Sequence, residues 1–436
     1  MANKLLINII VANLLWSFIP IVISGLFQDV SIIMIIFIRF LISGIILLFL
    51  ALLIVVLNNN ISIKEEIPLG LLLRNLFHKN RRFYDLKNII YYGLLGFFGI
   101  ILHIIFFFLT IKTTSISFTM SGFLISIILI AFYEKGIYFE KFDIFKVLYL
   151  VMLTFSIIIL IAVSATGAIL KGNPIGINAV IYLLIFSITI SFLYISINND
   201  AYSKEEIKTI NENNIYKIPR LLIKMSFSFL LGTLLMIPFV YIIFLIPVQT
   251  DLTLEVIQFF HQLPQFIGIM SRWEIIFLII FSTIIPYLLV YIANANWKAT
   301  YLTYTQWSSI LNLIDPLGSL IFAVILVNEY FPYEYLIIVI FFFTITIIFR
   351  YAHEIKNLVQ AVVLLNLKKG GISTIPTRIL KYHGVQSAHA LIGTNDLLVN
   401  IKISSIKDFY YLINNRLKPI REVNNLEILF INKQEK

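Results

Sequence analysis

An acidic residue lies in the middle of one long apolar stretch, residues 303–331. The stretch is long enough to cross a bilayer, yet it carries Asp315-Pro316 at its centre and Glu329 near its end. A carboxylate at the centre of a membrane helix costs roughly 2.5–3.5 kcal/mol on insertion scales. A proline there removes a backbone hydrogen bond and bends the helix, so Pro316 is a predicted helix break. We therefore expect this helix to face other helices or a water-filled cavity.

The Asp315 carboxylate has two interpretations. It would bind a substrate ammonium group or a coupling proton, or it would cap the backbone that is broken at Pro316. Arg39 lies close to the start of an earlier apolar segment, and its side chain also has two interpretations. Its guanidinium would hold a substrate carboxylate, or it would extend along its stem to the membrane interface.

Three further side chains within apolar segments are candidates for a buried polar site. His103 would relay a proton or form part of hydrogen-bonded packing. Trp16 and Trp307 would line a cavity, or would pack between helices and at the interface. Pro20 and Pro286 are predicted helix breaks because each lies inside an apolar segment.

The composition is that of a polytopic membrane protein. Hydrophobic residues make up 60% of the 436 residues and charged residues only 13%, against roughly 25% charged in soluble domains. The absence of cysteine excludes disulfides and Cys-ligated metals. We find no Walker loop, no nucleophile elbow and no metal-ligand spacing, so we expect neither an enzyme, a cofactor nor direct use of ATP.

Ten apolar segments are long enough to span the bilayer. They are residues 5–25, 31–57, 89–111, 117–133, 144–165, 177–197, 221–246, 273–293, 303–331 and 334–351. The loops at 58–88 and 198–220 are rich in Lys and Arg, which places them in the cytoplasm. An even number of spans places both termini on that side too, in a multi-pass plasma-membrane protein. The net charge of +10 is explained by this topology, so nucleic acid is not an expected partner.

The ten spans divide into two sets of five. Residues 1–166 form the first set and residues 177–351 the second, and 167–176 is a linker containing Gly172-Asn173-Pro174. Five spans per half give the halves opposite orientations, which is the inverted-repeat plan of secondary transporters.

Polar residues near span ends are candidates for gates or for helix-end caps. In each half a Lys-Thr or Lys-Ala-Thr turn precedes an apolar helix that ends at a glutamate. The second-half glutamate is Glu329, and either Glu134 or Glu140 occupies the first-half position, with Glu140 favoured by its spacing from Lys112. Asn294 precedes the second turn and is either part of a gate or of an interfacial loop.

Residues 352–436 are as polar as a soluble domain. We expect strand 360–367, helix 373–382, strands 385–392 and 396–403, helix 406–417 and strand 424–430. Val399, Ile401 and Ile403 alternate with polar residues, which indicates a strand with one buried face. The βαββαβ order predicts a ferredoxin-like α+β domain.

The membrane part resembles the EamA-type transporters of the drug/metabolite transporter superfamily over residues 5–351. The matching pieces are Asn13-Leu14-Leu15-Trp16-Ser17-Phe18, then Phe37-Ile38-Arg39-Phe40, then Asp315-Pro316-Leu317 leading to Asn328-Glu329. The resemblance implies a ten-helix inverted repeat with both ends cytoplasmic. The first half departs from the family pattern because its fourth segment lacks the proline.

The tail resembles the ligand-binding module of the Lrp/AsnC family over residues 359–432. The segment that carries this is Leu391-Ile392-Gly393-Thr394-Asn395-Asp396-Leu397-Leu398-Val399. The resemblance implies a domain that pairs into dimers and binds an amino-acid effector near Gly393, Asn395 and Asp396. Gly393 is expected to supply a positive φ, and Asp396 either contacts ligand or stabilises the turn.

Together these features predict a secondary transporter of a small polar metabolite that works by alternating access. We expect its cavity to be lined by the first, third, fourth, sixth, eighth and ninth spans. An amino acid or a close relative is the favoured substrate, because the Lrp/AsnC module that the tail resembles binds amino acids. The alternative is a membrane-anchored sensor or assembly protein that does not transport, which has no need of a polar cavity inside the bundle.

Overall fold

The computed structural model describes residues 2–61, 86–138, 143–197, 217–297, 302–356, 359–368, 375–380, 382, 384–403 and 406–430. Within these ranges, ten helical segments are long and apolar enough to cross a membrane. They are Leu5–Ser24, Ile32–Asn58, Ile90–Thr113, Ile116–Tyr133, Ile144–Leu170, Ile177–Ser196, Lys217–Phe244, Trp273–Asn296, Tyr304–Leu326 and Tyr333–Lys356. These segments lie close to the spans expected from the sequence, and the chain is a multi-pass membrane protein.

Six of these spans are continuous helices and four are interrupted. The continuous ones are α3 (Ile32–Ile61), α7 (Ile116–Tyr138), α8 (Ile144–Leu170), α9 (Ile177–Ile197), α11 (Lys217–Phe244) and α18 (Tyr333–Lys356). The first and ninth spans are broken into α1 (Ala2–Ser17) with α2 (Ile19–Ser24), and α16 (Tyr304–Leu311) with α17 (Ile314–Leu326). The third span consists of α5 (Leu86–Leu94), the π-helical η1 (Leu95–Leu102) and α6 (His103–Thr113). The eighth span consists of α14 (Trp273–Ile279), the π-helical η4 (Ile280–Ile284) and α15 (Ile285–Asn296).

The three prolines expected to break helices lie at three of these interruptions. Pro20 follows the break between α1 and α2, and Pro316 follows the break between α16 and α17. Pro286 is the second residue of α15, which begins where the π-helical η4 ends. In each case the proline lacks the N–H that would continue the helical ladder. Local backbone chemistry therefore explains where these spans bend.

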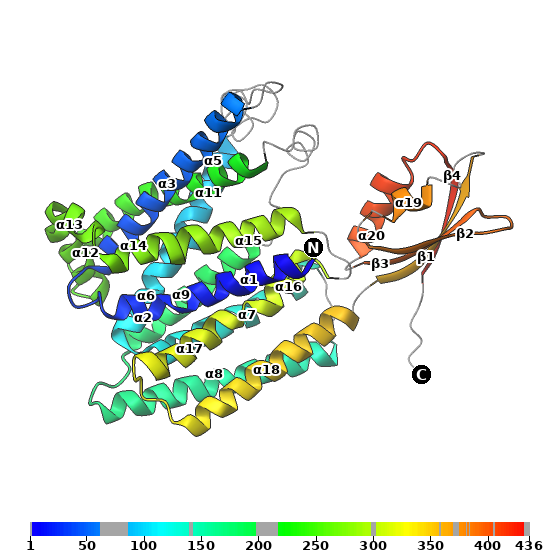
Figure 1. The fold of residues 1–436 in the computed structure, drawn as a ribbon. Coiled ribbons are helices and arrows are strands. Elements are labelled where there is room, and N and C mark those ends of the chain that lie inside the picture. The colour runs from blue at the N-terminus through cyan, green and yellow to red at the C-terminus, as the bar shows by residue number, and fades with distance from the viewer. Residues whose placement is uncertain are drawn as a thin grey trace.

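The connection between α11 and α14 is helical rather than an extended loop. It contains α12 (Asp251–Gln262), the 3₁₀ turn η3 (Leu263–Gln265) and α13 (Phe266–Met270). Thr250 begins α12 as a capping box with Thr253, and this local signal accounts for the helix. Figure 1 shows α12 and α13 at one end of the bundle, and the N-terminus and the C-terminal domain at the opposite end.

Glycine allows the two halves of the bundle to approach closely. A Cβ on Gly96 would lie 1.9 Å from the Ser228 carbonyl oxygen and 3.0 Å from the Gly232 Cα. The third span therefore packs backbone against backbone on α11, as small residues allow between membrane helices. The helix α3 also runs beside α11, and α8 runs beside α18.

Two further contacts between spans are compatible with an inverted repeat. The helix α1 packs against α15, and α6 packs against α9. If the sixth span is equivalent to the first and the eighth to the third, these two contacts are related by symmetry. The third and eighth spans also share a π-helical turn. The repeat itself stays a prediction.

The C-terminal domain has the predicted ferredoxin-like arrangement. Its strands are β1 (Val359–Leu367), β2 (Val385–Ala390), β3 (Leu397–Ile403) and β4 (Val423–Phe430), in the antiparallel order β2-β3-β1-β4. The helices α19 (Ile375–Ile379) and α20 (Ile406–Leu412), with the π-helical η5 (Ile413–Leu417), lie over one face of the sheet (Figure 1). The alternate residues of β3 from Leu397 to Ile403 are buried beneath them. On the opposite face Val362 is half-buried and its neighbour across the strands, Leu429, is exposed.

Candidate functional site

A cavity of about 50 Å³ lies inside the bundle and is lined by residues from seven of its spans. All six spans expected to line a cavity contribute to it, and α3 contributes in addition. Four of the five residues singled out for a buried polar site meet here, from four different spans. They are Trp16, Arg39, His103 and Asp315.

Arg39 is the fully buried cation of this cavity. Its side chain comes from α3 and the residue is only 1% exposed, so it does not extend to an interface and the expectation of a surface-reaching stem is wrong. Nε donates to Thr283 Oγ1 at 2.6 Å, and Nη2 donates to the Ser282 carbonyl at 2.9 Å. Nη1 is buried without a hydrogen-bond partner. A buried charged donor without a partner is costly, so this nitrogen is the natural contact for an anionic ligand group.

The Ser282 carbonyl is available to Arg39 because of the proline four residues later. In an α-helix this carbonyl would accept from the N–H of residue 286, and Pro286 has none. The π-helical η4 occupies the same turn, and such turns are frequent at functional sites. Thus Pro286 acts on the cavity indirectly, by freeing an acceptor that orients the guanidinium.

Asp315 is the buried carboxylate of the cavity, in the first turn of α17 and 6% exposed. It does not cap that helix, since the N-cap residue is Leu313 and no side chain caps it. The hydrogen bond described for its carboxylate is a long one of 3.4 Å from Ser319 Oγ. No ion pair within the described residues joins Asp315 to Arg39, although both line the same cavity. Because no side chain caps α17, the interpretation that Asp315 caps the backbone broken at Pro316 is wrong.

A close helix approach brings Asp315 to the first span. A Cβ on Gly318 would lie 2.7 Å from Ser17 Oγ, so only glycine lets α17 lie this close to the break after α1. Ser319 Oγ also lies 3.3 Å from the Ser17 carbonyl oxygen. Two broken helices thus cross beside the cavity, an arrangement typical of transporter binding sites.

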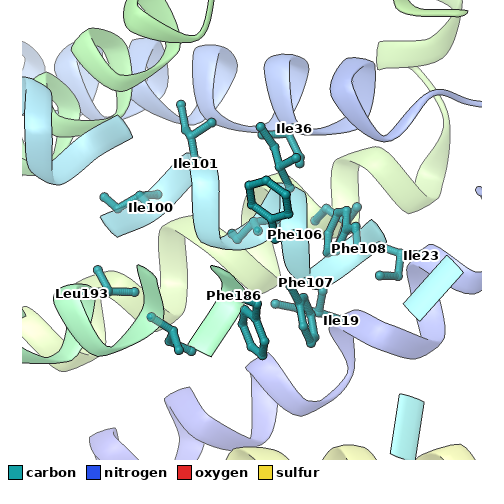
Figure 2. Packing of buried hydrophobic residues seen from close by; sticks show 14 of the residues in the cluster. Ile19, Ile23, Ile36, Ile100, Ile101, Phe106, Phe107, Phe108, Phe186 and Leu193 are labelled. Atoms are coloured by element: carbon teal, nitrogen blue, oxygen red, sulfur yellow. The ribbon is translucent and has the colours of Figure 1, made fainter. Parts of the chain in front are cut away.

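His103 and a group of aromatic rings complete the wall. His103 Nδ1 lies 2.5 Å from the Gly99 carbonyl, so Nδ1 carries the proton in this bond. Its ring stacks on Phe186, which packs against Phe107 with ring centroids 5.1 Å apart. Figure 2 shows the Phe107 and Phe186 rings beside one another in this packing. On the other side, the Trp16 ring meets Tyr287 edge-on at 5.5 Å.

The structure does not bring the other predicted site residues into this cavity. Trp307 packs on Tyr351 at 5.7 Å and belongs to a small separate cluster with Leu302 and Ile310, so the expectation that it lines the cavity is wrong. Asn294 lies in the last turn of α15 and is half-buried. Glu140 lies outside the described residues.

Glu329 lies at a helix end, but the helix is in the other half of the chain. Its carboxylate accepts from the Ile116 and Ser117 N–H groups at 3.0 and 2.9 Å, at the beginning of α7. Asn328, with φ of +54°, takes the left-handed conformation that ends α17 and turns the chain toward α7.

In the C-terminal domain, the hairpin of interest lies between β2 and β3. Gly393 has the expected positive φ, at +153°. Asp396 Oδ2 accepts from the Leu367 N–H at 2.6 Å, so this carboxylate ties the hairpin to the end of β1. Asn395 is half-buried, and Ile392 is fully exposed at the tip. The hairpin thus protrudes, while Asp396 stabilises its base.

Several residues of the cavity carried little signal in the sequence. Tyr194 and Tyr287 line the cavity, and Thr283 and Ser319 bond its charged groups. Hydroxyl-bearing residues are common in membrane helices, where most bond their own backbone. The sequence does contain one signal for this part of the cavity. Pro286 has no N–H for the Ser282 carbonyl to accept from, so this carbonyl is expected to be free for another donor.

The fold and the site define a class: a multi-pass membrane protein with a buried polar cavity and a C-terminal ferredoxin-like domain. Residues 3–162 match the EamA-like transporter family, and residues 360–436 match the Lrp/AsnC ligand binding domain. The chain therefore joins a region similar to the EamA-like transporter family to a domain similar to the Lrp/AsnC ligand binding domain.

Comparison with curated proteins found no match. A solved structure titled "Crystal structure of protein" is similar over 81% of this chain and 99% of its own, at 13% identity and a TM-score of 0.45.

Proposed function

We propose that this protein is a secondary transporter of a small zwitterion, with an amino acid or a close relative as its substrate. It works by alternating access around the cavity that holds Arg39 and Asp315. It lies in the plasma membrane with both termini in the cytoplasm, as the basic loops predict.

The observation that carries this proposal is the pair of opposite charges that line one cavity without pairing. Arg39 and Asp315 are 1% and 6% exposed, and no ion pair links them in the described structure. Two buried charges that serve stability alone are expected to neutralise each other, because each uncompensated charge costs several kcal/mol. A ligand with one carboxylate and one ammonium group compensates both at once.

The geometry of the donors suggests how such a ligand is held. Its carboxylate accepts from the unpartnered Arg39 Nη1, and the bonds to Ser282 and Thr283 hold the guanidinium in place. Its ammonium group donates to Asp315, whose only described bond is the long one from Ser319. The apolar wall around Phe107 then contacts the remaining side chain of the substrate.

The size of the cavity implies that the bundle must move. At about 50 Å³ it holds a few water molecules, well below the roughly 300–1,000 Å³ typical of ligand pockets. A substrate enters only when helices on one side separate. Rocking of two inverted halves provides this motion.

The C-terminal domain is proposed as a cytoplasmic sensor that dimerises and biases the transport equilibrium. The apolar side chains on the outer face of the sheet, among them Val362 and Leu429, support pairing with a second copy. The exposed hairpin tip at Ile392 supports an effector site near Gly393 and Asn395. The polar cavity in the bundle favours a transporter over a membrane-anchored sensor, which needs none.

Uptake of radiolabelled amino acids into vesicles that contain the full-length protein tests the proposal. Wild-type protein should accumulate one or more of them, and Asp315→Asn should take them up about 100-fold less efficiently, although ligand binding by the C-terminal domain persists. Glu334→Gln, an exposed glutamate at the start of α18, is the matched control and should transport normally. Uptake by Asp315→Asn at the wild-type rate would refute the role of this carboxylate.

A further inference from the structure

We infer that Glu255, on the helical connection α12–α13, is a latch that closes the bundle at the end opposite the termini. The inference rests on the proposed function, because it describes how access to the transport cavity is controlled. The helix α12 belongs to the second half of the chain, and the residues described as hydrogen-bonded to the Glu255 carboxylate, Lys112 and Ile32, belong to the first half.

Both carboxylate oxygens of Glu255 are in use. Oε1 accepts from Lys112 Nζ at 2.5 Å, at the end of α6, and Oε2 accepts from the Ile32 N–H at 2.6 Å, at the beginning of α3. The Glu255 side chain is only 4% exposed. An anionic acceptor suits a helix N-terminus, where N–H groups lack intrahelical partners. One carboxylate therefore joins α12 to two spans of the other half.

The neighbouring bonds reinforce the same contact. Ser31 Oγ donates to the Glu255 carbonyl at 2.7 Å, and the Ser31 N–H donates to Gln262 Oε1 at 2.9 Å. Gln262 also donates to the Asp29 carbonyl at 2.7 Å, so the second turn and the C-terminal end of α12 are both tied to the segment before α3. Arg272 pairs with the Asp29 carboxylate at 3.0 Å. The turn before α3 is thereby clamped to the α12–α13 connection.

Glu329 makes a second tie of the same kind. It follows α17, in the second half, and accepts from the first N–H groups of α7, in the first half. The beginning of α7 lies four residues after Lys112, so both ties act at the same end of the bundle. In each case the second half supplies a carboxylate and the first half supplies a helix N-terminus.

The position of the Lys112–Glu255 pair fits a closed entrance. A groove of about 600 Å³ at this end is lined by Lys112, Glu255, Asp251 and Gln258. A solute of substrate size fits in this groove and meets the ion pair, whereas the central cavity holds only about 50 Å³. Opening this end requires the Glu255 bonds to break, so they set how often the cavity opens here.

The experiment uses the fact that the chain contains no cysteine. Ile190→Cys places a single thiol on the cavity wall, at a position 2% exposed. The labelling rate with a membrane-impermeant thiol reagent is measured on the full-length protein in intact cells and in inverted vesicles. These two preparations expose the two ends of the bundle in turn.

Adding Glu255→Gln should speed labelling from the α12 end by roughly tenfold, as expected for loss of a charge-assisted bond. Labelling from the opposite end should slow, because the population shifts toward the state open at α12. Lys112→Met, which leaves the Ile32 bond in place, should give a smaller shift in the same direction and replaces Glu255→Gln if that variant does not fold. Glu334→Gln is the control and should change neither rate.

Equal labelling of Glu255→Gln and Glu334→Gln at the α12 end would overturn the latch. Faster labelling at both ends would overturn it too, since it would indicate general loosening of the bundle. Substrate uptake is measured on the same preparations without the reagent. A shift in labelling without any uptake would leave the latch standing and refute the transport proposal, so the two failures are distinguishable.

Discussion

Charged side chains are arranged differently at the central cavity and at the α12 end of the bundle. At the α12 end, Glu255 and Glu329 use both carboxylate oxygens in bonds of 2.5 to 3.0 Å. At the cavity, Arg39 retains a nitrogen without a partner, and Asp315 has one described bond of 3.4 Å. We interpret this difference as two roles: the charges with hydrogen-bond partners hold the halves together, and the cavity charges bind the proposed substrate.

The largest expected effect is on transport when a cavity charge is removed. Arg39→Gln and Asp315→Asn should each lower kcat/KM for uptake by about 100-fold, because a charged hydrogen bond contributes roughly 1.5–3 kcal/mol. Arg39→Lys keeps the charge but loses the planar guanidinium, so its kcat/KM for uptake should lie between the values of these variants and of wild type. Initial uptake rates in vesicles measure this. Activity of Arg39→Gln equal to that of Arg39→Lys would contradict the account.

The comparison also predicts opposite effects on stability. Glu255→Ala should lower the apparent Tm, since it leaves the buried Ile32 N–H without its acceptor, at a cost of about 1–3 kcal/mol, and also removes the partner of Lys112. Asp315→Asn should leave Tm unchanged or raise it, because it removes a buried charge that lacks a partner. Thermal unfolding of the full-length protein in detergent measures both. A lower Tm for Asp315→Asn than for Glu255→Ala would break the distinction between the two regions.

A pair of glycine substitutions sharpens the comparison. Gly318→Ala should push α17 away from α1, because the new Cβ would lie 2.7 Å from Ser17 Oγ, and overpacking of this kind costs about 1–3 kcal/mol. Gly268→Ala, in α13, meets no atom within 4 Å and is the control. We expect Gly318→Ala to raise KM and lower Tm, while Gly268→Ala changes neither. Identical kinetics for the two variants would show that α17 does not need this close approach.

The smallest expected effect is in the C-terminal domain. Asp396→Asn weakens the bond to the Leu367 N–H and should lower the stability of this domain by about 1 kcal/mol. Because Asp396 serves the hairpin and not the cavity, the KM for substrate should not change. Limited proteolysis of the full-length protein tests the stability of the domain, and uptake assays test the KM. Asn395→Ala is the matched control for both measurements. A raised KM for Asp396→Asn alone would indicate a direct link between hairpin and cavity.

The sequence predicts most of this molecule because membrane spans and strands have strong patterns. The ten spans and the four strands lie close to their expected positions. Arg39, His103 and Asp315 could be recognised because charged and titratable residues are rare in apolar spans and tend to face inward. Trp307 was misplaced because aromatic residues are common in such helices, so that residue type alone does not distinguish a cavity wall from packing.

The contacts between distant segments could not be predicted. Glu255 lies in a polar connection where a glutamate is unremarkable, and its partners are Lys112 and Ile32, far away in the sequence. The unpaired state of Arg39 and Asp315 is likewise a property of packing, because the sequence does not say whether two opposite charges on different helices meet. The distances between side chains on different helices, which the sequence does not contain, are needed to distinguish a binding cavity from a latch.

In the proposed function, the cavity binds the substrate carboxylate at Arg39 and the substrate ammonium group at Asp315. The most direct test is competition against uptake of the best amino-acid substrate by three compounds: the same amino acid unlabelled, its α-carboxamide and its deaminated acid. The account predicts that both analogues compete at least roughly tenfold more weakly than the amino acid, since each leaves one buried charge without a partner. Equal competition by either analogue would show that the corresponding charge does not bind the substrate, and would contradict the account.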